Sequence, residues 1–509
     1  MRAVTMRVQR STIWLGLLSV MLAVALAAAG AHAQQQPPDQ TNQDQQQNQD
    51  PSQGQTQGQD QSQSQAEQPI PAYHSPLASM ANNSQPDTGA QQYAPDTTPL
   101  AGAENLSVGV PLERHSYWAP LLSVLATGDS NPLAGTNTGW VTYETIAGGV
   151  DLDKASRNSD LLLTYLGGGT FSNDSGLGNT VFQELGVTET LRWRRNTLSF
   201  IDEVAYLPES GFGYGGSVGL PGLSVGTLQP GFVPGETVLT TQGQRISNSF
   251  VTQFDRALSG RSSITLVGGY SLLHFFDNNL LNDADITFQG GYNYLLTRRD
   301  TVALLYHFDQ LRFAAVSPRI DNHTVQASYG RRVTGRLAFQ VAAGPEISVY
   351  PDSLLTLGTI ATNSSAHLYW SMNSALTYQE ELTSLGLSYF HGVTGGSGVF
   401  VGALSDQVSG SISRRLSRVA TLGLNAGYSR NKELDTGVIA SSNQYYGYWF
   451  AGASFLKPLT RTVSLSLAYQ FQYQQSNDGF CIGVQCGTSF TRNVISLGVN
   501  WNARPIPLD

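Results

Sequence analysis

The sequence carries little charge. Lys, Arg, Asp and Glu make up 13% of its 509 residues, whereas an ordinary soluble domain has about 25%. Lysine is almost absent, and the polar residues are mostly Ser, Thr, Gln, Asn and Gly. A soluble β-sandwich normally presents Lys and Glu to water, so this composition argues against one. The net charge of −9 and the lack of a basic stripe exclude nucleic acid as an expected partner.

Long apolar runs are also scarce. After residue 33 no apolar run reaches about 18 residues, so no membrane-spanning helix is expected. The single long run, residues 13–29, follows three arginines and ends in the small residues of Ala31-His32-Ala33. This order predicts a signal peptide over residues 1–33 and therefore an exported protein.

Large apolar residues are nearly missing from the next segment. Residues 34–68 are Gln-rich, and residues 69–104 continue as a polar, Pro-bearing stretch. Such a segment buries too little apolar surface to offset the entropy of ordering. We expect residues 34–104 to form a disordered periplasmic arm, either a spacer or a tether to a periplasmic partner.

Cysteine occurs only at Cys481 and Cys486. An exported chain meets an oxidising compartment, so we expect a disulfide that closes this small loop. The segment offers too few ligands for a metal site.

The chain does contain regular alternation of apolar and polar residues from about His115 onward. In residues 462–474 one parity is apolar and the other polar, and residues 285–296, 336–350 and 493–503 repeat the pattern. The apolar parity of residues 462–474 consists of Val463, Leu465, Leu467, Tyr469, Phe471 and Tyr473. Period-2 alternation predicts β-strands with two different faces.

Two kinds of connection alternate between these strands. Short, often basic turns such as Thr297-Arg298-Arg299-Asp300 alternate with longer segments rich in Gly, Asn and Asp. This predicts an all-β fold over residues 105–509: a transmembrane antiparallel up-and-down β-barrel of about 18 strands, within a range of 14 to 18. We place the first strand at 115–126 and the last at 493–503.

With these features, the chain from His115 to the C-terminus resembles the porin-like outer-membrane β-barrels of Gram-negative bacteria. The resemblance rests on pattern and topology. It implies a location in the outer membrane, contact with its lipid and lipopolysaccharide, and insertion by the barrel assembly machinery. Such barrels usually end on an aromatic residue, whereas here Trp501 is followed by residues 502–509.

Strand parity also assigns candidate pore-lining residues. The polar parity places these side chains in the lumen: Glu184, Arg192, His307, Asp309, Arg332 and Glu346. His367 also has lumen parity, whereas His323 and His391 have the parity of the lipid face. Groups on opposite faces of a wall do not converge, so we predict no catalytic residue, metal site or cofactor. Asp202 and Asp406 fit the lipid face badly, and we expect a bulge or local loss of strand at each.

The longest connection, Glu209–Asn248, contains many apolar residues and glycines. We expect it to fold inward and narrow the bore, as the third outer loop does in the general porins that the chain resembles. The constriction candidates are Phe212, Tyr214, Phe232 and Glu236. The alternative is a loop that lies over the rim.

Three functions remain open. The first is a passive channel for small polar solutes or ions, with an acidic outer mouth that attracts cations. The second is a scaffold barrel whose arm engages a periplasmic partner, for instance in polysaccharide export. The third is an outer-membrane enzyme with a site at the rim. A barrel of about 16 to 18 strands encloses water, whereas enzyme barrels are small and filled, which disfavours the third.

Overall fold

The computed structural model of the chain describes residues 116–132, 139–156, 158–172, 179–207, 245–276, 281–314, 319–352, 355–356, 359–360, 363–395, 400–417, 420–434, 445–476 and 489–508. All of them belong to one compact unit, Glu67–Asp509. The predicted signal peptide, the predicted arm, residues 209–244 of the predicted constriction loop and both cysteines lie outside the described residues.

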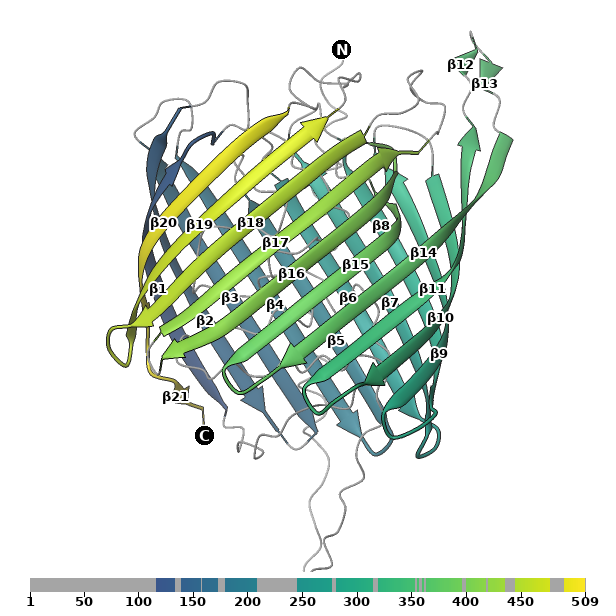
Figure 1. The fold of residues 1–509 in the computed structure, drawn as a ribbon, viewed down its shortest axis with the longest axis horizontal. Coiled ribbons are helices and arrows are strands. Elements are labelled where there is room, and N and C mark those ends of the chain that lie inside the picture. The colour runs from purple at the N-terminus through teal and green to yellow at the C-terminus, as the bar shows by residue number, and fades with distance from the viewer. Residues whose placement is uncertain are drawn as a thin grey trace, which may run out of the picture. The chain divides into compact units, whose positions relative to one another are not determined.

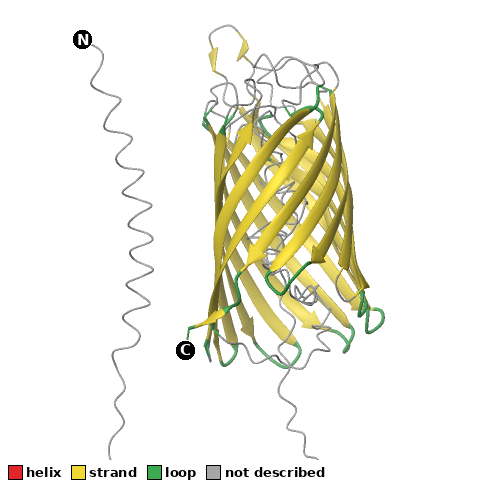
Figure 2. Cartoon of the chain, turned by 90° about the vertical axis from the view of Figure 1, so that its left-hand side faces the viewer, coloured by secondary structure: helices red, strands yellow, loops and turns green. Residues whose placement is uncertain are grey.

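The described chain is built from strands (Figures 1 and 2). The long ones are β1 (Tyr117–Asp129), β2 (Val141–Ala155), β3 (Ser159–Ser172), β4 (Thr180–Trp193), β5 (Asn196–Leu207), β6 (Arg245–Ala257), β7 (Ser262–Phe275), β8 (Asp283–Leu295), β9 (Asp300–Phe313), β10 (Arg319–Arg332), β11 (Leu337–Asp352), β14 (Asn363–Gln379), β15 (Thr383–Thr394), β16 (Ala403–Ser417), β17 (Ala420–Glu433), β18 (Tyr445–Pro458), β19 (Val463–Ser476) and β20 (Phe490–Asn502). Three two-residue strands accompany them: β12 (Leu355–Thr356), β13 (Thr359–Ile360) and β21 (Ile506–Pro507). Among the described residues no helix is long and apolar enough to cross a membrane.

Each long strand pairs antiparallel with its neighbours along the chain, and the ring closes where β1 pairs with β20. The sheet has 19 strands including the short β21, so 18 long strands form the wall. They run obliquely across it (Figure 1). A closed antiparallel barrel leaves no sheet edge with unpaired backbone groups, which is what lipid requires. The predicted fold and strand number are confirmed, and the first and last strands begin within three residues of the predicted positions.

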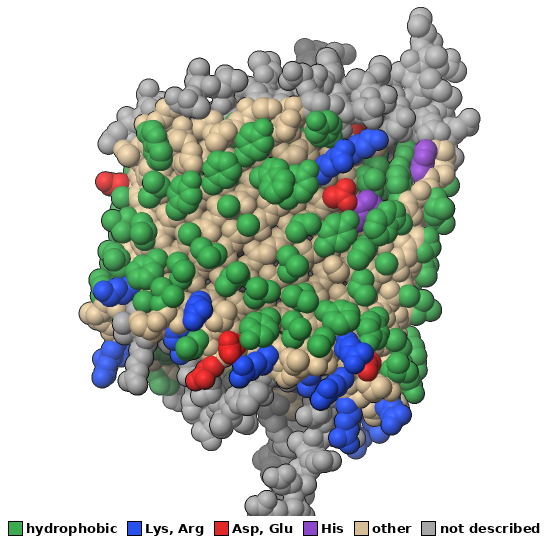
Figure 3. Space-filling model, viewed as in Figure 1, with side chains coloured by type: hydrophobic (Ala, Val, Ile, Leu, Met, Phe, Trp, Pro, Cys, Tyr) green, Lys and Arg blue, Asp and Glu red, His purple; other side chains and the backbone are tan. Residues whose placement is uncertain are grey.

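The two faces of the wall differ as the alternation predicted. On β19, Ser464, Ser466 and Gln472 are buried, whereas Leu467 and Tyr469 are exposed. We call the face with exposed apolar side chains the outer face and the opposite one the inner face. Figure 3 shows apolar side chains spread over the visible outer face, with most Lys and Arg near one rim. This apolar belt is the surface that a transmembrane barrel presents to lipid.

The two ends of the barrel also differ, and we name them the turn end and the loop end. Four connections at the turn end share one device, in which a Ser or Thr hydroxyl accepts a hydrogen bond from the backbone N–H two residues later. The four side chains are Ser259, Thr297, Thr334 and Thr460. Such hydroxyl-closed turns favour short connections between antiparallel strands. β1 starts and β20 ends at this end, which an even strand number requires.

The expectation of a bulge at Asp202 and at Asp406 was wrong. Both lie in regularly paired strands, and the pairing of β16 with β17 shifts register elsewhere, between Arg415 and Ser417. Each acid faces outward and takes hydrogen bonds from a neighbouring strand instead. Asn248 Nδ2 donates to Asp202 at 2.8 Å, and Asp406 is contacted from β15. Asn248 lies on β6, which begins at Arg245. Residues 245–248 of the predicted 209–248 loop are therefore strand.

Candidate functional site

All six candidate pore-lining residues lie on the inner face. On β9, Leu304 and Tyr306 are exposed and Ala303 and Leu305 are buried, so the odd positions point inward. The same alternation on β4, β10 and β11 places the remaining candidates inside. The six are Glu184, Arg192, His307, Asp309, Arg332 and Glu346. Whether they line a conducting path remains a proposal.

The structure brings three of the six together near the loop end. His307 Nε2 lies 2.6 Å from Asp309 Oδ2 on the same strand. His307 pairs with Thr324 on β10, and Thr324 pairs with Glu346 on β11, so His307 and Glu346 stand in one row of the wall. Neighbouring strands are about 4.8 Å apart. The row therefore places the two residues about 10 Å apart, on the same face of the wall.

Two aspartates on β8 extend this group. Asp283 and Asp285 share the inner parity with Thr287 and Gln289, which are buried. Asp285 pairs with Leu311 and Asp309 pairs with Thr287, so the two aspartates are diagonal neighbours on adjacent strands. Sequence reasoning missed Asp285 as a site residue, although its parity within the 285–296 alternation was available. We name Asp283, Asp285, His307, Asp309 and Glu346 the acidic cluster.

The other three candidates lie elsewhere. Arg192 is at the turn end, where its Nη2 is 3.4 Å from Asp160 Oδ2 on β3. Arg332 is at the turn end of β10, the opposite end of the wall from Glu346. Glu184 is on β4, and within the described chain its Oε1 has no hydrogen-bond partner. None of the three joins the acidic cluster.

A segment of chain folds over the acidic cluster from inside the barrel. The pairing of β14 with β15 stops at Met372–His391, and beyond it β15 bends away from β14. The Val393 N–H donates to the Glu346 carboxylate, with oxygens at 3.3 and 3.4 Å. A Cβ on Gly395 would come within 2.6 Å of Asp283 Oδ2, although β8 is not a neighbour of β15 in the sheet. We name residues 392–395 and 400–402 the inner segment.

Apolar contacts fix the inner segment to the wall. Val393 and Val401 are buried in one hydrophobic cluster with side chains of β9, β10 and β11, of a residue just before β8 and of the residue after β17. Its other members are Leu281, Leu311, Phe313, Ile320, Tyr350 and Leu434. Gly402 allows the approach because its φ is +81°, in the region that favours glycine. Burial of this apolar surface makes the inner segment a fixed part of the bore.

We predicted a constriction in another loop, residues 209–248. The candidates Phe212, Tyr214, Phe232 and Glu236 lie outside the described residues, as do Cys481 and Cys486. The inner segment was missed. Its only sequence signal is the Gly-rich stretch Gly395-Gly396-Ser397-Gly398 next to the apolar pair Phe400-Val401.

The histidines divide between the two faces, as predicted. His323 faces outward, where its Nδ1 lies 2.8 Å from the hydroxyl of the exposed Tyr306. His367 faces inward and stacks on the buried Tyr350 at 4.4 Å. His391 faces outward and stacks on the exposed Trp370 at 4.5 Å. The described residues contain no group of three or more His, Cys, Asp or Glu that could hold a metal ion.

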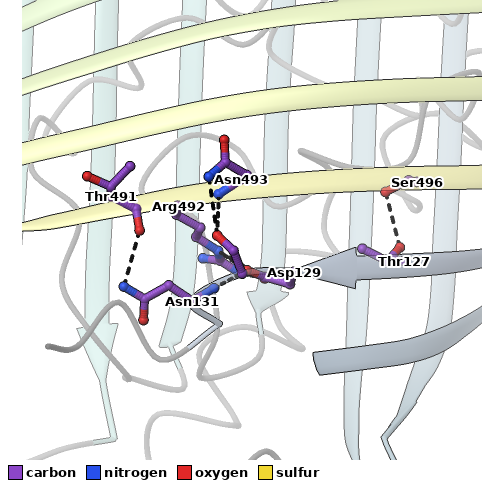
Figure 4. Close-up of polar contacts among 8 residues, drawn as sticks. Thr127, Asp129, Asn131, Thr491, Arg492, Asn493 and Ser496 are labelled. Carbon is purple, nitrogen blue, oxygen red and sulfur yellow. Dashed lines mark hydrogen bonds and ion pairs between the residues drawn. The ribbon is translucent and has the colours of Figure 1, made fainter. Parts of the chain in front are cut away.

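A second polar site lies where the barrel closes (Figure 4). Arg492 on β20 donates through Nε to both oxygens of Asp129 on β1, at 3.0 and 2.9 Å, and its Nη2 forms an ion pair with the same carboxylate. Thr127 and Ser496 share a hydrogen bond of 3.1 Å in the same seam. These contacts join the first and last strands on the inner face, and sequence reasoning did not find them.

Comparison with known proteins gives distant likenesses. No family model and no curated protein matches the chain. The structure of Pseudomonas aeruginosa OpdQ matches at 11% identity and a TM-score of 0.38, over 77% of this chain and 98% of that chain. Acinetobacter baumannii OccAB3 matches at 12% and 0.39, over 77% and 99%. Pseudomonas aeruginosa OccK2 in complex with glucuronate matches at 10% and 0.37, over 77% and 98%.

These likenesses are too distant to carry an argument about substrate, and the chain's own geometry decides its class. The wall of 18 strands is closed, its outer belt is apolar and its inner face is polar. These are the properties of a barrel that spans the bacterial outer membrane. The chain is a porin-like β-barrel of the outer membrane.

Proposed function

We propose that the protein is a passive diffusion channel for small polar solutes or ions, with a preference for cations. The acidic cluster carries this proposal. A barrel of 16 to 18 strands is wide enough to enclose water. Asp283, Asp285, Asp309 and Glu346 all stand on its inner face near the loop end. Negative charge on the wall of a pore raises the local concentration of cations.

The position of the inner segment favours a pore that is selective at its loop end over a wide, unselective opening. It hydrogen-bonds to Glu346 and approaches Asp283, so it lies against the acidic cluster. A solute that passes the loop end on this side meets the inner segment and, beside it, the partly exposed His307 and Asp309. Buried apolar contacts hold the inner segment in place. We therefore expect the ion selectivity to be present without any movement of this segment.

The geometry gives no support to an enzyme. The outward His391 contacts Asp406, which resembles two members of a catalytic triad. Among the described residues the His391 ring contacts Asp406 and stacks on Trp370, and no hydrogen bond joins it to a Ser, Thr or Cys. The inward His307 pairs with Asp309 on the opposite face of the wall and cannot complete that group.

Reversal potentials in a planar bilayer test the proposal. The full-length barrel should conduct and should favour K⁺ over Cl⁻ across a salt gradient. The variant D285N/D309N should lose much of this preference. In water, a unit charge about 6 Å from an ion contributes about 0.7 kcal/mol, or about threefold in local concentration. Two ionised carboxylates at this distance therefore change the ratio by up to about tenfold at low salt, and by less at 1 M because of screening.

D202N is the matched control, because it makes the same chemical change on the outer face. It should leave selectivity unchanged. An inserted barrel that does not conduct would contradict the channel. A conducting barrel with the same selectivity in D285N/D309N would remove the cluster from the path of the ions.

A further inference from the structure

The outer face of β17 carries an ordered series of side chains. From the turn end upward it presents Leu422, Leu424 and then Tyr428, followed by Arg430 and Lys432 at the loop end. Arg430 and Lys432 are exposed, and neither forms an ion pair with another described residue. Two unpaired cations on a lipid-facing wall are costly unless an anion meets them.

Aromatic side chains lie next to this basic pair, with Tyr428 and Trp449 below it and Tyr445 opposite Lys432 in the register. Tyr428 contacts Trp449 of β18, with ring centroids 4.2 Å apart, and Trp449 is exposed. The Arg430 guanidinium lies over the Tyr445 ring, 5.7 Å from its centroid. Exposed Tyr and Trp on a barrel mark the interface between hydrocarbon and headgroups. The basic pair therefore lies at the loop-end edge of this aromatic girdle.

Strand geometry also places Arg430 and Lys432 near the boundary between hydrocarbon and headgroups. Arg430 is three residues from the end of β17. At about 3.3 Å per residue and a tilt of about 40°, this is about 8 Å below the loop end of the strand. A strand of 14 residues is then about 35 Å tall, against an apolar belt of about 25 Å. The guanidinium thus lies near the edge of the belt, and Lys432 lies beyond it, at headgroup level.

The nearest acid is already engaged by other partners. Asp406 on β16 stands opposite Arg430 in the register. Its Oδ1 lies 2.6 Å from His391 Nδ1 and accepts a hydrogen bond of 3.2 Å from the Tyr389 hydroxyl. Both contacts come from β15, on the side away from β17. Figure 3 shows basic, acidic and His side chains gathered near the loop-end rim of this face.

A cation elsewhere on the outer face does have an internal partner. On the outer face at the loop end of β10, Arg319 donates through Nε to Asp321 at 2.9 Å, so that cation has an internal anion. Arg430 and Lys432 have no such partner in the described chain. The wall over β16–β18 therefore has an excess of positive charge at headgroup level.

We propose that Arg430 and Lys432 form a binding site for the phosphate of an anionic membrane lipid, with Tyr445 and Trp449 beside the lipid's sugar or glycerol and acyl groups. An arginine donates several N–H groups in a fork that matches phosphate, and the lysine adds a second, flexible donor. This site is on the outer face, so it does not depend on the proposed channel.

Native mass spectrometry of the full-length barrel, released from detergent micelles, tests the site. Lipid A, which carries two phosphates, is the probe, and a phosphate-free diacyl glycolipid is the comparator. Each cation at an anionic membrane surface contributes about fivefold, so R430Q/K432Q should bind lipid A about 30-fold more weakly. R430K/K432R keeps both charges and should retain most of the binding.

R298Q/R299Q is the matched control. It removes two adjacent exposed arginines from a turn, away from the outer belt, and should bind lipid A like the unchanged protein. Heat-modified gel migration of every variant establishes that the barrel is folded. Equal lipid A binding by R430Q/K432Q and the control would overturn the proposal.

Two other results would also overturn it. If millimolar inorganic phosphate displaces lipid A completely, the site takes a free anion rather than a lipid. If R430Q/K432Q leaves lipid binding unchanged but converts an oligomer to a monomer, the basic pair belongs to an interface with a second copy of the chain.

Discussion

Replacement of Arg492 by Met should destabilise the closed barrel strongly. The Arg492 and Asp129 side chains are only 3% and 0% exposed, so the ion pair is almost fully removed from water. Loss of the arginine leaves the Asp129 carboxylate buried without its counter-charge. Breaking a buried pair by removal of one partner costs about 3–5 kcal/mol, because the remaining charge keeps its desolvation penalty.

The double variant D129N/R492M separates the cost of an unpaired buried carboxylate from the net contribution of the ion pair to the free energy of unfolding. It removes both charges, and the Asn keeps the shape of the aspartate. Replacement of a whole buried pair by uncharged residues of similar volume is often close to neutral. We therefore expect D129N/R492M to recover most of the stability that R492M loses.

Urea unfolding of the barrel in lipid vesicles measures the free energy of unfolding, and heat-modified gel migration follows the same loss. R336M is the control, because Arg336 and Glu380 form an ion pair at the surface, 61% and 42% exposed. Such pairs contribute about 0–1 kcal/mol. The reasoning would be refuted if R492M were within about 1 kcal/mol of the unchanged protein, or if D129N/R492M were no more stable than R492M.

Two further predictions concern the loop end. Gly402→Ala should destabilise the barrel by about 1–3 kcal/mol in the same urea assay, because the φ of +81° is strained for Ala and its Cβ would lie 2.6 Å from Ile320 Cδ1. Gly335→Ala, where a Cβ meets nothing within 4 Å, is its control, and equal effects of the two changes would contradict this account of Gly402. Cys481 and Cys486 should be linked in non-reduced exported protein, and two free thiols in a mass spectrum would contradict the expected disulfide.

Period-2 alternation made the wall predictable from the sequence. The side chain at each strand position points to one face or the other, so a polar or apolar residue reports its own environment. This is why the inward positions of His307, Asp309 and Glu346, and the outward position of His323, agree with their parity. The short turns were predictable for the same reason, because their hydrogen bonds join residues close in sequence. The Thr297 hydroxyl, for example, accepts a hydrogen bond from the Arg299 N–H.

The sequence was a poor guide wherever the environment of a residue is set by a distant strand. Asp406 looked misplaced on the lipid face, and the bulge expected there is absent because His391 and Tyr389 on the next strand satisfy it. The acidic cluster is similar, because its members come from three strands that only the register brings into one patch.

Local pattern by itself determined that the chain forms an antiparallel barrel of about 18 strands and which parity of each strand faces lipid. Only the tertiary structure decided that Arg492 meets Asp129 across 363 positions of sequence, and that the inner segment bends inward to Glu346. The physical reason is the sequence separation of the interacting residues. Alternation and turn hydrogen bonds involve residues a few positions apart, whereas barrel closure and the inner segment depend on contacts between strands that sequence order does not place together.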